Sequence, residues 1–298
     1  MRESYIIDKN YNNSRFDKWF KTIILNIPQS LIEKILRKKK IKVNKKKVKT
    51  SYRLQTGDVV DIFNIGGLKP KNIKITSKYK SSKKERKIYD DFVIENNENF
   101  LVINKPSGIA VQSGTKTHKN IIDILSSSKY FEGKKPYIVH RLDKETSGVF
   151  IIAKNREYAQ LFTTLFRIRK IHKTYHAVAH GALNSKIKKL EDNLVYYDNQ
   201  KKITQKAITN LKIIKKNTDF SFLELNPITG RKHQIRKQLY AINHPIVFDQ
   251  KYYLERNKKE KNNLLLHAYK IKFMINEIKY NFKASYSKNF SQFLKKNF

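Results

Sequence analysis

The chain of 298 residues is long enough for one large domain or two smaller ones, and 39% of its residues are apolar, which is enough for a folded core. It carries 64 Lys and Arg against 25 Asp and Glu, and a net charge of +39 favours a polyanion such as nucleic acid as partner. The absence of cysteine excludes disulfides, thiolate zinc sites and a cysteine nucleophile.

The first residues of the chain give no sign of export. The opening stretch, MRESYIIDKNYNNS, has no apolar core of signal-peptide length. No apolar run in the sequence approaches the roughly 20 residues of a membrane helix. We therefore predict a soluble, cytoplasmic protein that does not associate with a membrane.

Residues 14–65 have the pattern of a small module with two helices and a sheet. Apolar residues at helical spacing from 16 to 23 predict a first helix with Ser14 as its N-cap. A capping box of Ser30 and Glu33 predicts the start of a second helix. The chain after that helix alternates apolar and polar residues, which predicts short strands.

The exposed face of this module is expected to be strongly basic. Positive charges gather at the end of the second helix and in the turn after it: Lys34, Arg37, Lys38, Lys39, Lys40, Lys42, Lys45, Lys46 and Lys47. Charges clustered in this way suit contact with RNA phosphates without base readout, although a solvated Lys-rich loop has the same composition. The segment 14–65 resembles an S4 RNA-binding domain of the α-L type.

The rest of the chain divides into a linker and a larger domain. Residues 66–87 are rich in Gly, Ser and Lys with weak periodicity, which is typical of a basic linker. From 88 to 298, short alternating runs predict strands, and the segment 158–166 has the spacing of an amphipathic helix. Because strands and helices do not alternate regularly, we predict an α+β domain with a mixed, mainly antiparallel sheet and flanking helices.

One carboxylate stands out in this domain, in the motif HRLDKETSG between two predicted strands. Asp143 has Arg141 and Lys144 beside it, and cationic neighbours favour the ionised form of a carboxyl group. The flanking strands would hold it in place, as a nucleophile or a base requires. In an unrelated sequence, however, such an aspartate is more often an Asx-turn or N-cap residue.

Two further motifs supply groups that this carboxylate could use. In NPITGRKHQIRKQL a tight turn leads into a helix that carries Arg231, His233 and Arg236 near its start. Arg can hold a carboxylate bidentately, although a basic helix start without a partner has the same pattern. In KTYHAV the alternation places Tyr175 on one face of a strand, either in the core or in a cleft where it can stack on a base or take a proton.

A resemblance connects these motifs. In their order and approximate spacing, four segments resemble the motifs of the RluA-type pseudouridine synthases: VINKPSG, VHRLDKETSGVFIIAK, KTYHAV and PITGRKHQIRKQL…HPIVFD. The resemblance covers about residues 88–285. With an S4-like module in front, the whole chain is similar to the family members that act on large-subunit ribosomal RNA. The type C pattern is the nearest, and type D, which has the same domain order, is second.

The resemblance implies a function for specific residues. It implies an isomerase that converts uridine to pseudouridine in 23S rRNA without a cofactor or a metal, and a monomer. Asp143 would be the nucleophile, Arg141 would fill the gap that the flipped uridine leaves, and Tyr175 would pack on the base. Arg236 would pair with Asp143. Apart from the resemblance, the turn that leads into a helix gathers donors suited to a phosphate, so we also expect Arg231 to contact the RNA.

Alternatives to this interpretation remain open from the sequence. A type D-like enzyme would modify other uridines of rRNA or tRNA. A non-catalytic S4-type ribosome-assembly protein would keep the fold without the chemistry, but it has no need for Asp143, Tyr175 and Arg236 together. Part of the positive charge could reflect a base composition that favours Lys codons. An anionic membrane is a weaker partner, because no long basic amphipathic helix stands out.

Overall fold

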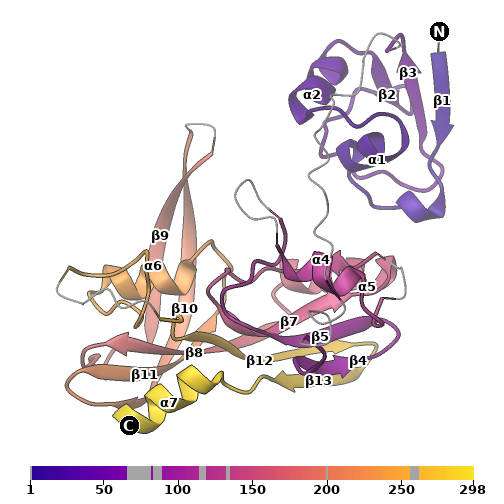
Figure 1. The fold of residues 1–298 in the computed structure, drawn as a ribbon. Coiled ribbons are helices and arrows are strands. Elements are labelled where there is room, and N and C mark those ends of the chain that lie inside the picture. The colour runs from indigo at the N-terminus through magenta and orange to yellow at the C-terminus, as the bar shows by residue number, and fades with distance from the viewer. Residues whose placement is uncertain are drawn as a thin grey trace. The chain divides into compact units, whose positions relative to one another are not determined.

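The computed structural model describes residues 2–65, 82, 89–113, 119–131, 135–198, 201–255 and 262–298. The chain divides into two compact units, residues 1–77 and 78–298, and each is described here by itself (Figure 1). The predicted domains at 14–65 and 88–298 each fall within one unit. The predicted basic linker at 66–87 lies outside the described residues except for Ser82.

The first unit packs two helices against a small sheet. Its elements are β1 (Arg2–Ile6), a 3-10 helix (Lys9–Tyr11), α1 (Phe16–Ile23), α2 (Gln29–Arg37), β2 (Ile41–Val43) and β3 (Val59–Phe63). The sheet is antiparallel with the order β1-β3-β2. The helical spacing seen in the sequence places Phe16, Trp19 and Phe20 in the core together with Ile32 and Ile35. Strand β1 lies ahead of the segment that we assigned to the S4-like module.

The predicted helix caps in this unit are wrong. Helix α1 has Arg15 at its N-cap, and α2 has Pro28, with no side-chain capping bond in either case. Ser30 therefore lies inside α2 and cannot form a capping box with Glu33. The backbone at the start of α1 is held instead by Tyr52, whose carbonyl accepts a hydrogen bond from the Phe16 N–H at 2.8 Å. Tertiary contacts thus replace the local caps that the sequence suggested.

The basic turn after β2 is a tight hairpin. Val43 and Lys46 exchange two backbone hydrogen bonds of 2.9 Å, and Asn44 and Lys45 between them both have positive φ angles, 49° and 62°. This is the geometry of a type I′ turn, and it favours Asn at the first position. The hairpin presents Lys45, Lys46 and Lys47 to solvent.

The second unit is built on one large sheet with helices on both faces (Figure 1). Its strands are β4 (Val93–Asn96), β5 (Phe100–Lys105), β6 (Tyr137–Ile138), β7 (Ser147–Ala153), β8 (His172–His180), β9 (Lys189–Asp198), β10 (Lys201–Lys216), β11 (Phe220–Pro227), β12 (Leu266–Ile275) and β13 (Ile278–Lys283). Its helices are α4 (Ile121–Ser126), α5 (Arg156–Arg167), α6 (Gln234–Ala241) and α7 (Lys288–Asn297). The strand order is β4-β5-β7-β12-β8-β11-β10-β9, with β13 beside β12 and β6 beside β7.

Alternation along β5 explains why the sheet is covered on both faces. Leu101 and Ile103 pack in the cluster that contains α4, whereas Phe100 and Val102 pack in the cluster that contains Phe162 of α5. Successive side chains of a strand point to opposite faces, so α4 and α5 cover opposite faces of the sheet. The α+β prediction is confirmed: the described strand pairs are antiparallel except for β7 with β12, which is parallel.

The parallel pair brings the HRLDKETSG motif next to the KTYHAV motif. Strand β12 pairs with β7 on one side and with β8 on the other, so the two motifs approach each other across a strand that comes later in the chain. Gly148 makes the close approach possible. Its φ is 111°, and a Cβ atom there would lie 2.3 Å from the carbonyl oxygen of Ala268 on β12.

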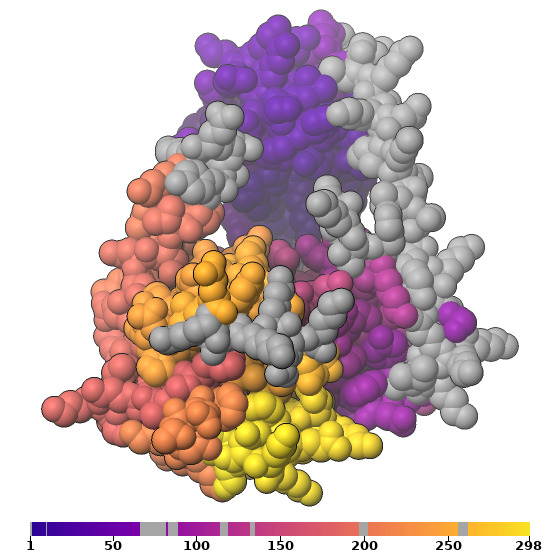
Figure 2. All heavy atoms as spheres, turned by 60° about the vertical axis from the view of Figure 1, so that its left-hand side comes forward, coloured from indigo at the N-terminus to yellow at the C-terminus, as the bar shows by residue number. Residues whose placement is uncertain are grey.

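The other half of the sheet ends in a long hairpin. Strands β9 and β10 pair over ten residues, and in Figure 1 the hairpin extends away from the rest of the sheet beside α6. In Figure 2 the same strands form the left edge of the second unit, next to the orange surface that contains α6. None of the helices that the structure describes is long and apolar enough to cross a membrane.

Candidate active site

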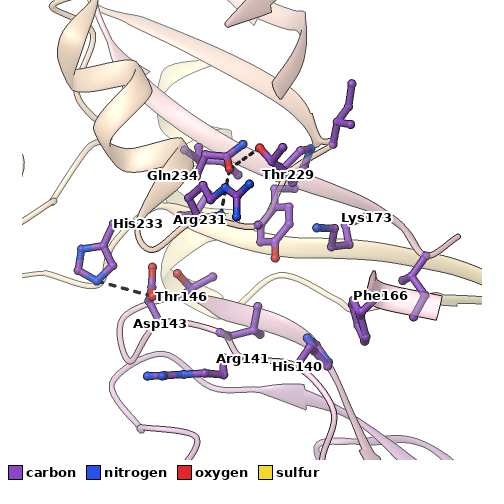
Figure 3. A pocket seen from close by; sticks show the side chains of 18 of the residues that line it. His140, Arg141, Asp143, Thr146, Phe166, Lys173, Thr229, Arg231, His233 and Gln234 are labelled. Atoms are coloured by element: carbon purple, nitrogen blue, oxygen red, sulfur yellow. Dashed lines mark hydrogen bonds and ion pairs between the residues drawn. The ribbon is translucent and has the colours of Figure 1, made fainter. Parts of the chain in front are cut away.

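A cavity of about 630 Å³ opens where the predicted motifs meet (Figure 3). Four segments and one residue of β12 line it: the turn before β7, the end of α5 and the residues after it, the pocket-facing side of β8, the loop that leads from β11 into α6, and Leu266. Five residues that we predicted from the sequence lie in its wall, namely Arg141, Asp143, Tyr175, Arg231 and Arg236. The structure therefore brings the motifs of the second unit together at one place.

The turn before β7 directs two side chains into this pocket. Leu142 is buried in the same cluster as α4 and anchors the turn. Arg141 and Asp143 flank it and reach the pocket instead, Arg141 with an exposed side chain and Asp143 with 30% of its side chain exposed. An N–H of Thr146 donates to the backbone carbonyl of Asp143 at 3.1 Å, which closes the turn.

The carboxylate of Asp143 is held loosely compared with its surroundings. No described residue donates a hydrogen bond to it, and its closest described basic group is Nε2 of His233, 3.6 Å from Oδ1. Burial lowers the pKa of His233, while the charge of Asp143 acts in the opposite direction. Nδ1 of His233 lies 3.0 Å from the hydroxyl of Tyr252, which fixes the ring beside Asp143. Free lone pairs on an accessible carboxylate are what a nucleophile needs.

Arg236 pairs with a different carboxylate from the one we predicted. Its Nε and Nη2 donate to the two carboxylate oxygens of Asp249, each at 2.7 Å, and Nη1 donates to Glu145 at 3.3 Å. No ion pair within 4 Å joins Arg236 to Asp143 in the described residues. The predicted direct pair is thus corrected, because Asp249 occupies the bidentate face of the guanidinium. Arg236 remains close enough for the charge of Asp143 to act on it.

The KPSG loop holds the turn of Asp143 from behind. Lys105 is fully buried, and its ammonium donates to the backbone carbonyls of Pro106, Ile109 and Lys144 at 2.9, 3.0 and 3.3 Å. Burial lowers the pKa of Lys105 to about 7. The Ser107 hydroxyl also donates to the carbonyl of Glu145 at 2.6 Å. The residues on either side of Asp143 are therefore fixed while its carboxylate is left open.

Tyr175 faces the pocket from the middle of β8. Burial and the charge of Asp143 both raise the pKa of Tyr175, so its phenol is neutral at physiological pH. A neutral ring can pack on a base and donate a hydrogen bond, but it is not a phenolate that would accept a proton. The packing role that we predicted for Tyr175 fits this environment better than the role of a base.

The loop before α6 is fixed by an internal hydrogen-bond network (Figure 3). Oε1 of Gln234 accepts from the Thr229 hydroxyl at 2.7 Å and from the Arg231 N–H at 3.0 Å. His233 has a φ of 53°, an unusual value for a residue other than glycine. This conformation turns the chain into α6 and places the ring of His233 toward Asp143. The Arg231 side chain donates to the Lys206 carbonyl at 3.2 Å and so ties the loop to β10.

The basic surface of the first unit lies where the sequence placed it. Lys34, Arg37, Lys38 and Lys39 are exposed at the end of α2 and just after it, and Lys45, Lys46 and Lys47 are exposed on the adjacent hairpin. A cavity of about 490 Å³ is lined by residues of this hairpin and of the segment after it: Val43, Asn44, Lys46, Lys47, Val48, Lys49, Ser51 and Tyr52. Exposed ammonium groups around a shallow cavity suit contact with a nucleic-acid backbone. In the described residues, no group of three His, Asp or Glu side chains could hold a metal ion.

Comparisons with known proteins agree with this arrangement. Residues 99–241 match the model of the RNA pseudouridylate synthase family, and residues 15–60 match that of the S4 domain. The ribosomal large subunit pseudouridine synthase C of Buchnera aphidicola (strain Bp) is 35% identical over 283 residues, which cover 90% of this chain and 88% of that protein. Its counterpart in Rickettsia felis is 35% identical over 280 residues, covering 88% and 90% of the two chains. The chain belongs to the RNA pseudouridine synthase family.

The fold of this pseudouridine synthase agrees with a solved relative. The structure of human RNA pseudouridylate synthase domain containing 4 is 25% identical, has a TM-score of 0.60, and covers 70% of this chain and 94% of its own. The sequence prediction of an S4 domain followed by a pseudouridine synthase domain is thus confirmed, and RNA is the partner of the enzyme. All residues that line the pocket lie inside the matched residues 99–241, except for Leu266.

Several side chains of this synthase site were not predicted from the sequence. Asp249 stands in the quoted motif HPIVFD and Lys105 in VINKPSG, but neither motif indicates which side chain it contacts. His233 was grouped with the basic residues of the turn, without a link to Asp143. Lys173 was not singled out, although alternation along β8 places it on the same face as Tyr175.

Proposed function

We propose that this enzyme isomerises specific uridines to pseudouridine in large-subunit ribosomal RNA, with Asp143 as the nucleophile. The observation that carries the proposal is the contrast between two carboxylates near Arg236. Asp249 is saturated by the guanidinium, whereas Asp143 opens into the pocket beside Tyr175 without a hydrogen-bond donor among the described residues. The ribosomal target is inferred from relatives that are 35% identical over nine-tenths of the chain. A cytoplasmic location follows from this target.

The reaction fits the roles that we assign to the pocket. The bond between N1 of the base and C1′ of the ribose breaks, the base turns, and a new bond forms between C5 and C1′, with loss of the C5 proton and gain of a proton at N1. Asp143 either attacks C1′ or removes the proton from C2′, and both routes begin from an ionised, accessible carboxylate. Tyr175 packs on the base. Arg236 fixes Glu145 two residues from the nucleophile and adds a positive charge behind it.

Arg141 is proposed to take the place of the flipped uridine. Its side chain is exposed at the mouth of the pocket, and a planar guanidinium can stack where a base has left. Arg141→Ala should therefore slow conversion of a stacked uridine more than that of an already unstacked one. Single-turnover rates on a duplexed and on a looped substrate measure this. Equal losses on both substrates would refute the role.

Release of tritium from C5 tests the proposed function directly. Large-subunit rRNA labelled with tritium at C5 of uridine should release tritium with the wild-type enzyme and no added cofactor, and Asp143→Asn should abolish the release while RNA binding stays within a few-fold. Asp91→Asn, an exposed carboxylate of the same unit, is the matched control. Release from tRNA but not from large-subunit rRNA would overturn the ribosomal target, and wild-type rates for Asp143→Asn would overturn the nucleophile.

A further inference from the structure

A lysine also enters the pocket from β8: Lys173, the first residue of the KTYHAV motif. Lys173 and Tyr175 alternate along β8, and both line the cavity together with Ile171, the residue just before the strand. Figure 3 shows Lys173 directed into the pocket on the side opposite to Asp143. A Cβ atom on Gly230 would lie 3.9 Å from Nζ of Lys173, so the ammonium lies against the backbone of the loop before α6.

The ammonium of Lys173 has no partner among the described residues. Arg236 and Arg231 are bound by a carboxylate and a carbonyl, respectively, but Lys173 forms no hydrogen bond or ion pair in the part of the chain that the structure describes. Burial lowers the pKa of Lys173, and no described carboxylate opposes that effect. A half-buried cation without a counter-charge is unfavourable in the free enzyme. A negative charge that arises in the pocket during the reaction would remove this cost.

The proposed reaction generates such a charge on the base. When the N1–C1′ bond breaks, its electron pair goes to N1, and the uracil leaves as an anion whose charge is shared with O2 and O4. In the direct route a carboxylate oxygen of Asp143 forms the new bond to C1′; in the other route it takes the C2′ proton. Both routes release the same anion. If the ribose lies at Asp143 and the base against Tyr175, the base can turn a carbonyl edge toward Lys173, which lines the same pocket.

We propose that Lys173 stabilises the uracil anion by donating a hydrogen bond to one of its carbonyl oxygens, which makes it a catalytic residue. This inference rests on the proposed function. Lys173 keeps its proton throughout. C5 of the anion bonds to C1′ as the Asp143–C1′ bond breaks or, in the other route, as Asp143 returns the proton to C2′; the C5 proton is then lost and N1 takes up a proton from solvent. A hydrogen-bond donor that is already directed at the developing charge stabilises it more strongly in a water-poor pocket than water molecules would. The reason is that the donor, unlike water, does not have to reorient during the reaction.

Leaving-group dependence distinguishes this role from simple RNA binding. Fluorine at C5 withdraws electrons, so the base of 5-fluorouridine leaves more readily as an anion. Lys173→Met should lower the single-turnover rate on uridine about 10²- to 10³-fold, with RNA affinity within a few-fold. The loss on RNA with 5-fluorouridine at the target, followed as disappearance of that nucleoside from nuclease digests, should be smaller by about tenfold or more. A residue that binds a phosphate would lose the same factor on both substrates.

The controls separate the possible failures. Lys170→Met removes an exposed charge from the same segment and should leave both rates unchanged. Lys173→Arg keeps a cation, so it should retain more activity than Lys173→Met, and it remains testable if the Met variant does not fold. Equal losses on the two substrates, or full activity of Lys173→Met, would overturn the inference. An inactive wild-type enzyme on uridine would instead overturn the proposed function.

Discussion

Asp58 and Asp61 in the first unit have environments opposite to that of Asp143 in the second. In the first unit, Asp58 accepts from Asn44 at 2.8 Å, from the Gln55 N–H at 2.8 Å and from Tyr52 at 3.2 Å. Asp61 accepts from Ser4 at 2.7 Å and from Arg2 at 2.9 Å, and these hydrogen bonds lower the pKa of Asp61.

Asp143 in the second unit has 30% of its side chain exposed and no hydrogen-bond donor among the described residues. In a chain with a net charge of +39, acids are scarce and cationic donors are abundant, so an acid without donors needs an explanation. Saturated carboxylates hold structure together, because removing a buried acceptor leaves its donors unsatisfied. An unsaturated one contributes little to folding but keeps its lone pairs for a substrate. The difference predicts which acids matter for stability and which for chemistry.

Exchanging Asp for Asn at both kinds of site gives the largest expected effect. Asp143→Asn should lower the rate of pseudouridine formation about 10⁴-fold or more, with the free energy of unfolding unchanged. Asp61→Asn should lower the free energy of unfolding and leave the rate unchanged, since it weakens the bonds to Arg2 and Ser4 within the first unit. Single-turnover rates and urea unfolding measure the two quantities. The only tryptophan, Trp19, reports unfolding of the first unit by its fluorescence. A large loss of stability in Asp143→Asn would break the comparison.

The sequence predicted the alternation and the motifs but not which charges meet. Period-two spacing correctly placed Tyr175 on one face of its strand, because that pattern is local. The partner of Arg236 was wrong because it depends on the loop after α6, which brings Asp249 to the guanidinium. The neighbouring β7, β12 and β8 could not be ordered from periodicity either, since β12 follows β8 by almost 90 residues and inserts between the other two. Local patterns therefore predict elements, while nonlocal pairing decides the electrostatics of the site.

Substitution of Asp249 has the next largest expected effect, this time on stability as well as on activity. Asp249→Asn removes the charge that saturates buried Arg236, and it should reduce the free energy of unfolding by about 3 kcal/mol, because an uncompensated buried charge is costly. Activity should fall with it, since Arg236 and Glu145 lose their fixed positions. The double variant Asp249→Leu with Arg236→Met separates the two causes. It should regain stability without regaining activity, and recovery of both would mean that Arg236 has only a structural role.

The exposed lysines of the first unit should have a moderate effect on RNA binding alone. Replacing Lys45, Lys46 and Lys47 by Gln should lower RNA affinity about tenfold at moderate salt. The slope of log affinity against log salt should become less steep by about 2, because a protein with fewer phosphate contacts releases fewer counterions from the RNA when it binds. Replacing Lys288, Lys295 and Lys296 of α7 by Gln changes the net charge equally and is the control. Equal effects of the two triple variants would show that total charge matters and not the hairpin surface.

The smallest expected effect concerns His267, a neutral side chain beside the active-site turn whose two ring nitrogens are both hydrogen-bonded. His267 is fully buried between the Ser147 hydroxyl, 2.9 Å from Nδ1, and the Ala284 carbonyl, 3.2 Å from Nε2. Burial lowers the pKa of His267 to about 4, against 6.5 for an unburied histidine. Between these values the unfolded chain binds a proton that the folded chain does not. Stability is therefore fully retained above pH 6.5 and falls as the pH drops toward 4, by up to about 1.4 kcal/mol for each pH unit.

His267→Gln removes this titration and keeps a donor and an acceptor in the same place. The difference in unfolding free energy between the wild type and His267→Gln should thus depend on pH between 6.5 and 4 and be constant above that range. Hydrogen exchange of the β12 segment reports the second unit, where no tryptophan is available as a probe. If the difference stayed constant down to pH 4, His267 would be protonated in the folded enzyme. The Ser147 hydroxyl would then have to accept the hydrogen bond from Nδ1 of His267 instead of donating it. A neutral His267 with both ring nitrogens hydrogen-bonded would no longer be what holds β12 beside the turn of Asp143.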